Sequence, residues 1–295
     1  MTETQPAAPP DLLLTLVAAA RRITAVRRAQ VPDAEMVERA KGRRPNGAGF
    51  ARALRDGATP RIIAECKRRS PSRGILREDY RPGEHAAAYA AAGAAAISVL
   101  TEPTFFDGSL EHLQEASAAV STPLLRKDFI VDRYQVLEAI ANGADAILLI
   151  VGALTKEALV GLLADAQHWG VAALVEVHDG DELRIAVEAG AEIIGVNSRN
   201  LRTLAVEPGL HERLAAKIPR GTLAVAESGL REPADLERLR KAGYQAFLVG
   251  ERLIAEPDPG AALHALRAGK RGPEGSAREA PAPRGNGARP WRSNR

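Results

Sequence analysis

The sequence predicts an α/β protein, a (β/α)₈ barrel of the TIM type, because eight apolar strand-like runs alternate with eight helical patterns. Most of the runs are apolar throughout, as expected for parallel strands covered on both faces. Glycine-centred turns at Gly93, Gly143, Gly190 and Gly243 each close a helix and lead into a strand. A doubly wound open sheet is the competing architecture. Its dinucleotide-binding form carries a Gly-rich fingerprint after the first strand, and the sequence has none there.

The element boundaries follow from short β-rich runs and from helix-end residues, with proline near several helix starts and glycine after several ends. The expected strands are Arg61–Lys67, Ala95–Leu100, Pro123–Lys127, Ala146–Ile150, Ala172–Val177, Ile193–Asn197, Leu223–Glu227 and Ala246–Val249. The expected helices are Pro82–Ala92, Ser109–Ala119, Arg133–Asn142, Thr155–His168, Asp179–Ala189, Pro208–Ile218, Pro233–Ala242 and Pro259–Arg267.

Three regions are expected along the chain. Residues 1–60 form an N-terminal helical extension that caps the base of the barrel or folds over its mouth. Residues 61–267 form the catalytic barrel. Residues 268–295 are rich in Pro, Gly, Arg and Ala without periodicity, which predicts a disordered basic tail.

The charge distribution argues against nucleic-acid binding by the folded part. Residues 268–295 carry seven basic and two acidic residues, a net charge of +5, whereas the whole chain is only +3. Residues 1–267 therefore sum to −2, so only the tail is expected to make weak contacts with anionic polymers. No apolar run predicts a membrane span or a signal peptide. A single cysteine, with no Cys/His cluster, predicts a cytoplasmic protein without disulfides or a metal site.

Charged side chains gather at the C-terminal ends of the expected strands, where parallel barrels assemble their active sites. Glu65 and Lys67 end the first strand, and alternation places both on one face. An acid and an amine on an apolar strand are costly unless they pair or do chemistry. The other strand ends supply Lys127 with Asp128 and Phe129, Glu176, Asn197 with Arg199, Glu227 with Ser228 and Gly229, and Gly250 with Glu251.

Two of these loops predict a phosphate site. Gly229 and Gly250 follow the seventh and eighth strands, where barrels commonly bind phosphate through backbone N–H groups and a short helix. Ordinary turn glycines are the alternative interpretation. Glu251 would contribute its backbone N–H, with its side chain pointing away.

These motifs resemble the indole-3-glycerol phosphate synthase family over about Arg61–Leu253. The matching segments read IAECKRRSPS from Ile63, SVLTE from Ser98, FDGS from Phe106, LRKDFI from Leu125, GADAILLI from Gly143, EVH from Glu176, IGVNSRNL from Ile194 and AESG from Ala226. The resemblance implies a phosphorylated substrate, 1-(2-carboxyphenylamino)-1-deoxyribulose 5-phosphate. It implies ring closure onto the ribulose ketone, followed by loss of CO₂ and water, by acid–base catalysis without a cofactor.

The resemblance also implies roles for the strand-end residues. Lys127 is the general acid at the ketone oxygen, and Glu176 stabilises the iminium that develops on the anilino nitrogen. Glu65 is the partner of Glu176 or a base, and Lys67 is the candidate for dehydration. Which lysine serves which step stays open. Asn197 would orient the substrate, and Arg199 would hold a hydroxyl or neighbouring carboxylates.

Aromatic and hydroxyl side chains complete the expected site. Phe106 and Phe129 would form an apolar wall for the anthranilate ring, with rim packing as the alternative. Ser70 and Ser228 would make polar or phosphate contacts, with ordinary loop serines as the alternative.

Two other functions stay open, and each departs from the expected synthase. One is another phosphate-sugar barrel enzyme, similar to phosphoribosylanthranilate isomerase. The other is a non-catalytic binder of a phosphorylated ligand. The resemblance to the synthase family implies a monomer.

Overall fold

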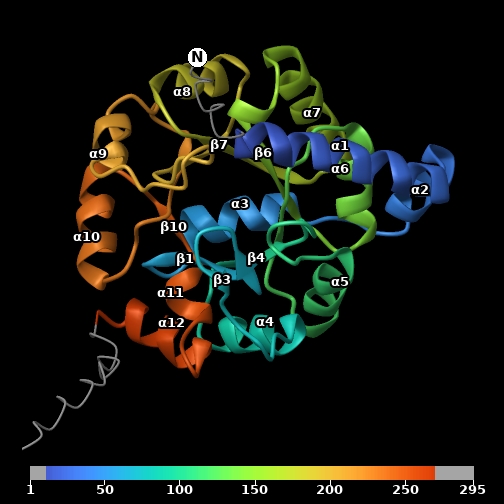
Figure 1. The fold of residues 1–295 in the computed structure, drawn as a ribbon. Helices are drawn as coiled ribbons and strands as arrows, with labels where there is room; N and C mark the ends of the chain where they lie inside the picture. The colour runs from blue at the N-terminus through green and yellow to red at the C-terminus, as the bar shows by residue number, and fades with distance from the viewer. Residues whose placement is uncertain (1–10, 270–295) are drawn as a thin grey trace, which may run out of the picture.

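Eight parallel strands close into a barrel in the computed structural model, which describes residues 11–269 (Figure 1). The strands are β1 (Arg61–Cys66), β4 (Ala96–Leu100), β5 (Leu124–Lys127), β6 (Ala146–Ile150), β7 (Ala172–Val177), β8 (Ile193–Asn197), β9 (Leu223–Glu227) and β10 (Ala246–Val249). Ala64 lies opposite Val249 where β1 closes the ring against β10. The expected barrel is confirmed, and every strand agrees with its predicted bounds to within one residue at each end.

Helices ring the barrel, one after each strand. They are α4 (Pro82–Ala91), α5 (Leu110–Ala119), α6 (Arg133–Ala141), α7 (Lys156–Trp169), α8 (Gly180–Glu188), α9 (Leu210–Ala215), α10 (Pro233–Ala242) and α12 (Pro259–Arg267). The expected helix Pro208–Ile218 is shorter in the structure. Gly209 caps it with a left-handed φ of 73°, and Pro219 disfavours helical geometry in the residue before it.

The loops after the strands carry small elements that the sequence analysis did not predict. A hairpin of β2 (Arg69–Ser70) and β3 (Gly74–Ile75) follows β1. A 3₁₀ turn, η1 (Val151–Ala153), follows β6, and α11 (Glu251–Ile254) follows β10 directly. All of them lie at the C-terminal ends of barrel strands, so they build the mouth of the barrel.

The N-terminal extension covers both ends of the barrel, so the two placements left open by the sequence are both correct in part. Its helices are α1 (Leu12–Gln30), α2 (Asp33–Lys41) and α3 (Gly47–Asp56). On α1, Leu13 and Leu16 are buried in the apolar cluster that contains Phe129 at the mouth. At the base, the Gly47 N–H donates to the Gly170 carbonyl, and Phe50 on α3 is fully buried.

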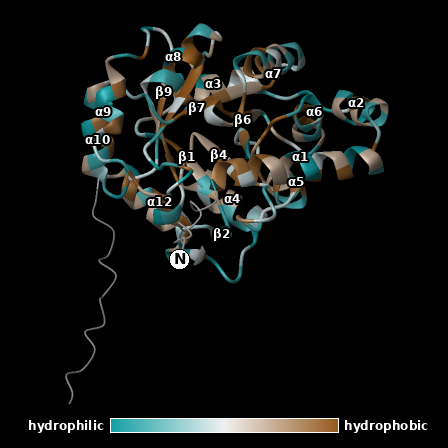
Figure 2. Ribbon diagram, turned by 45° about the horizontal axis from the view of Figure 1, so that its top comes forward, coloured by the Kyte–Doolittle hydropathy of each residue, from teal (hydrophilic) through white to brown (hydrophobic). Residues whose placement is uncertain are grey.

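Apolar side chains form two layers separated by the strands. In Figure 2 the hydrophilic residues, in teal, gather on the surrounding helices and loops. Inside the barrel, Ile63, Leu125 and Leu248 belong to one cluster. Between strands and helices, Ile62 and Cys66 belong to another. This alternation decides which strand-end side chains enter the mouth, because residues two apart share a face.

The structure describes only the beginning of the expected tail. Ala268 and Gly269 follow α12, and the rest of residues 268–295 lies outside the described residues, as do residues 1–10 of the extension. Within residues 11–269, no helix is both long and apolar enough to cross a bilayer.

Candidate active site

Lys127 lies at the centre of the barrel mouth, at the end of β5. Its Nζ lies 3.0 Å from Oε2 of Glu176 on β7 and 3.2 Å from Oε2 of Glu227 on β9. Both carboxylates are buried. Burial alone would lower the pKa of Lys127, but the charge of Glu176 and, to a lesser degree, the carboxyl groups of Glu227 and Glu65 outweigh it and raise that pKa. The lysine is therefore a charged ammonium at neutral pH.

Glu176 is held as a carboxylate by groups on both of its oxygens. Oε2 faces Lys127, while Oε1 accepts a hydrogen bond of 3.1 Å from Nδ2 of Asn197 on β8. Nε2 of His178 lies 3.2 Å from the same Oε1. Burial opposes ionisation, but Lys127, His178 and Asn197 together lower the pKa of Glu176 well below its usual range.

Glu227 has the opposite protonation state. Burial, together with repulsion from Glu176, raises its pKa to about 8, although Lys127 acts against that rise. Its Oε1 finds no hydrogen-bond partner within the described residues. At neutral pH the Glu227 carboxyl is protonated, so it can donate a proton where Glu176 cannot. The sequence placed Glu227 at a strand end but assigned it no role, because its pKa depends on Lys127 and Glu176 from other strands.

Glycine makes room for this buried carboxyl. A Cβ added at Gly195 on β8 would come within 3.0 Å of Oε1 of Glu227 and 3.2 Å of its Cδ. Gly250 does the same for Glu65, since an added Cβ there would lie 3.0 Å from the Glu65 Cβ and closer still to its Oε1. Gly195 lies on β8 beside Glu227 of β9, and Gly250 directly follows β10, the neighbour of β1 that carries Glu65, so their small size shapes the floor of the mouth.

Glu65 and Lys67 pair with each other, as the alternation along β1 predicted. Both side chains are largely buried, with 5% and 13% of their surface exposed. Ser70 follows on β2 and is buried, and its Oγ finds no hydrogen-bond partner among residues 11–269. A buried hydroxyl without a partner is costly unless a ligand supplies one.

An apolar wall lines one side of the mouth. The rings of Phe106 and Phe129 lie 6.4 Å apart between centroids, and both pack in the cluster that contains Leu13 and Leu16 of α1. The Phe106 loop is fixed by Glu102, whose carboxylate accepts backbone N–H groups from residues 104, 105 and 106 at 2.8, 2.7 and 3.2 Å. Glu102 is buried in this turn, so its carboxylate holds the aromatic wall in place.

Arg199 lies beside the site but bonds within its own loop. Its backbone N–H donates to Oδ1 of Asn197 at 3.0 Å, which fixes the amide that faces Glu176. Its guanidinium donates to the Leu204 carbonyl at 2.9 Å. Arg199 therefore supports Asn197 in this structure, and a direct contact between its guanidinium and a substrate stays a prediction.

The two expected phosphate loops lie side by side, because β9 and β10 are neighbours in the barrel. Ser228 and Gly229 both have left-handed φ values, 65° and 72°, in the loop after β9. Gly250 caps α11, whose first residue is Glu251. The Glu251 carboxylate pairs with Arg73 of the β2–β3 hairpin at 2.9 Å.

Comparison with known proteins identifies the family. The family model of indole-3-glycerol phosphate synthase matches residues 14–266. The chain belongs to the indole-3-glycerol phosphate synthase family. It is 51% identical to the indole-3-glycerol phosphate synthase of Sulfurimonas denitrificans, over 74% of this chain and 87% of that protein. It is 48% identical to indole-3-glycerol phosphate synthase 2 of Streptomyces coelicolor, over 86% of this chain and 98% of that protein.

Solved structures of low sequence identity share the fold of this indole-3-glycerol phosphate synthase family member. A 3-hexulose-6-phosphate synthase superposes with a TM-score of 0.56 at 17% identity, covering 72% of this chain and all of that one. The thiamine phosphate pyrophosphorylase of Pyrococcus furiosus gives 0.53 at 16% identity, over 70% of this chain and 94% of that one. These likenesses support the barrel alone.

A buried ion network lies behind Lys127 in this family member. Arg126 points away from the mouth and is fully buried, and its NH2 lies 2.8 Å from Asp128 and 2.9 Å from Glu138. Glu138 also pairs with Arg27 of α1 at 3.2 Å. The network ties the end of β5 to α1 over the mouth. Residues 11–269 contain no group of His, Cys, Asp and Glu placed to hold a metal ion.

Proposed function

We propose that this protein is an indole-3-glycerol phosphate synthase that acts on 1-(2-carboxyphenylamino)-1-deoxyribulose 5-phosphate. The substrate closes a ring, loses CO₂ and water, and becomes indole-3-glycerol phosphate. Family membership supports the reaction. The Lys127 ammonium between Glu176 and Glu227 is the observation that carries its mechanism.

Ring closure needs a proton at the ketone oxygen while the anthranilate carbon attacks the ketone carbon. Lys127 is charged and lies at the centre of the mouth, so we assign it as the general acid. As the new carbon–carbon bond forms, positive charge develops on the anilino nitrogen. Glu176 is ionised and water-excluded, so its charge can stabilise that iminium strongly.

The later steps restore aromaticity. Loss of CO₂ returns an electron pair to the ring and neutralises the iminium. The new hydroxyl then leaves as water, which needs an acid at the oxygen and a base at the neighbouring carbon. Glu227 joins Lys67 as a candidate acid because its pKa near 8 leaves it protonated at neutral pH. Glu65, paired with Lys67, is the candidate base.

Binding would use the remaining residues of the mouth. The anthranilate ring would pack on Phe106 and Phe129, and the orphaned Ser70 hydroxyl would bond a polar group of the substrate. Asn197 and Arg199 would orient the substrate. The phosphate would lie at the loops after β9 and β10, which contain Ser228, Gly229, Gly250 and Glu251. We further propose that the protein works as a cytoplasmic monomer without a cofactor.

A fluorescence assay for the indole product tests the proposal with purified protein and the carboxyphenylamino substrate. Turnover without added metal or nucleotide is expected, and Lys127→Ala should lower it by at least about a thousandfold, since an acid acting only in the transition state is removed. Near-normal turnover in that variant would refute the role of Lys127. A folded wild-type protein that binds the substrate without turnover would be a binder, and turnover of phosphoribosylanthranilate instead would make it an isomerase.

A further inference from the structure

His178 is a largely buried titratable group that the proposed mechanism does not use. It follows β7 and lies two residues after Glu176, so alternation turns both side chains to the mouth. Only 12% of its side-chain surface is exposed. A buried imidazole is uncharged unless carboxylates stay close enough to hold the proton.

Two carboxylates flank this imidazole, one near each ring nitrogen: Nδ1 is hydrogen-bonded, whereas Nε2 makes a close charge contact without a hydrogen bond within residues 11–269. Nε2 lies 3.2 Å from Oε1 of Glu176, and Nδ1 lies 3.1 Å from Oε2 of Glu182 in the first turn of α8. The same Oε2 of Glu182 accepts the His178 backbone N–H at 2.7 Å. A Cβ added at Gly152 on η1 would meet the other oxygen of Glu182 at 2.7 Å, so this pocket is tightly built around the second carboxylate.

This arrangement separates His178 from the other buried histidines. Burial lowers the pKa of His85, His112 and His211. Burial acts in the same direction on His178, but Glu176 and Glu182 outweigh it and raise its pKa to about 10. The ring is therefore an imidazolium throughout the neutral range.

Glu176 consequently has a cation on each side. Oε1 lies close to Nε2 of His178, which follows β7, and accepts a hydrogen bond from the neutral amide of Asn197 on β8. Oε2 faces the ammonium of Lys127 on β5. Without the imidazolium, Lys127 would be the only cation beside Glu176, and its ammonium would be bound more tightly. A more tightly held proton is transferred to the ketone more slowly.

We propose that His178 is a positioning residue, whose imidazolium, held by Glu182, anchors Oε1 of Glu176 and leaves Oε2 to Lys127 and to the cation that develops on the substrate. This inference rests on the roles proposed above for Lys127 and Glu176. The charged groups that face His178 are Glu176 from its own strand and Glu182 from α8, with Lys127 beyond Glu176.

Ring-nitrogen NMR of the ¹⁵N-labelled full-length protein tests the charge independently of turnover. His178, assigned by its loss in His178→Gln, should keep both ring protons at about pH 8.5, where an ordinary histidine is neutral. A neutral His178 ring at about pH 7.5 would overturn the proposal. Because this readout needs no catalysis, it stands even if Lys127→Ala refutes the proposed role of Lys127.

Kinetics then test the function of the charge. His178→Gln should lower kcat about tenfold with KM within about twofold, since substrate binding is spared and proton transfer is not. Glu182→Gln keeps an acceptor for the backbone N–H of His178 but removes the negative charge that faces its ring. The pH at which kcat declines should therefore be about one unit lower in Glu182→Gln than in wild type, because His178 loses its proton at a lower pH.

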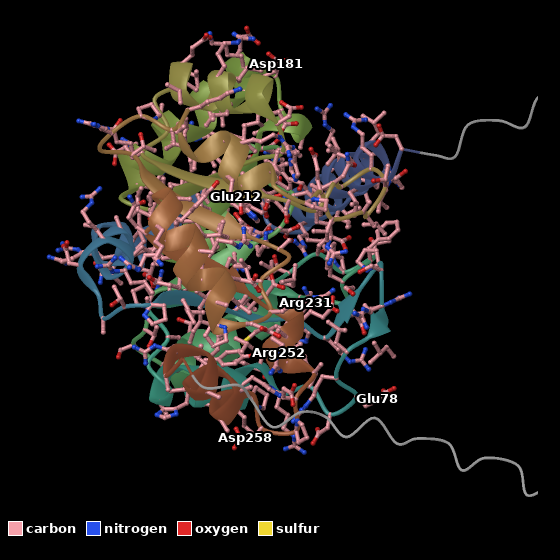
Figure 3. All side chains as sticks on the ribbon, turned by 90° about the vertical axis from the view of Figure 1, so that its left-hand side faces the viewer. Glu78, Asp181, Glu212, Arg231, Arg252 and Asp258 are labelled. Carbon is pink, nitrogen blue, oxygen red and sulfur yellow. The ribbon has the colours of Figure 1, made fainter. Side chains whose placement is uncertain are left out.

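The matched control is Asp181→Asn, which removes one charge from the exposed neighbour of Glu182 (labelled in Figure 3). It should behave as wild type at every pH. The proposal fails if kcat of His178→Gln is within twofold of wild type, or if the pH profile of Glu182→Gln superimposes on that of Asp181→Asn. Should His178→Gln fail to fold, the pH profile of Glu182→Gln, compared with that of Asp181→Asn, still decides.

Discussion

Gly195→Ala adds one methyl group against the protonated carboxyl of Glu227. The added Cβ would lie within 3.0 Å of Oε1, 3.2 Å from Cδ, and 3.3 Å from Cδ1 of Leu174 on the other side. The strand backbone and the Leu174 contact leave the methyl group nowhere to go. Glu227 must therefore retreat by roughly 1 Å to regain an ordinary contact distance.

That retreat has two measurable consequences. The 3.2 Å contact between Glu227 and Lys127 lengthens, and a misplacement of about 1 Å at a reacting centre costs about a hundredfold in rate. Overpacking of this kind destabilises by about 1–3 kcal/mol. At about 2–4 °C for each kcal/mol in a chain of this size, about 2 kcal/mol lowers Tm by about 4–8 °C.

Product fluorescence and thermal unfolding measure the two effects on the same preparation. Gly161→Ala is the matched control, because an added Cβ on this exposed position of α7 meets nothing within 4 Å. It should keep full activity and gain about 0.5–1 kcal/mol from helix propensity. If Gly195→Ala has the kcat and Tm of wild type, the close packing of Gly195 on Glu227 is not what shapes the site.

Two further changes test the buried charges. Arg126→Met leaves Asp128 buried without its cation and Glu138 with Arg27 alone, so denaturant unfolding should show a loss of about 3–5 kcal/mol, and a loss under about 1 kcal/mol would contradict the network. Glu227→Gln should gain stability relative to wild type as pH rises. The pKa of Glu227 is 4.5 in the unfolded chain and about 8 in the folded protein, so its protonated form stabilises the folded wild type. This stabilisation is complete below about pH 4.5 and is lost between about pH 4.5 and about pH 8, by about 1.4 kcal/mol per pH unit. A Tm difference between the two proteins that stays constant from about pH 5 to about pH 9 would refute that pKa.

The barrel was predictable because its signals are local. Apolar runs such as Ala146–Ile150 repeat eight times, and glycine ends four of the expected helices before a strand. Each of these signals can be recognised from its own residues. The β2–β3 hairpin and α11 were missed because two strand residues or four helical ones are too few to show a period. The two placements of α1 and α3 could not be told apart, since both helices are simply amphipathic in sequence.

The candidate site was predictable as a set of positions but not as a network. Alternation put Glu65 with Lys67, and strand order put Lys127, Glu176 and Asn197 on one rim. Contacts between strands depend on their neighbours, so the sequence could not reveal that Lys127 lies between Glu176 and Glu227. Local loop geometry likewise decides that His178 lies against Glu176 and that Arg199 turns its guanidinium to Leu204. Protonation states follow from those contacts, so a role for Glu227 could be assigned only from the structure.

The extension that covers both ends of the barrel also orders events during synthesis. Residues 11–56 leave the ribosome before the barrel strands, yet Arg43 pairs with Asp145, 102 residues later, and Gly47 bonds the carbonyl of Gly170. Contacts so distant in sequence form late. This segment is therefore made before the barrel but docks after it, and the apolar side chains of Leu16 and Phe50 stay without their partners until most of the strands have emerged. Folding is thus completed when α1 docks over the mouth and α3 docks at the base of a barrel that has already assembled.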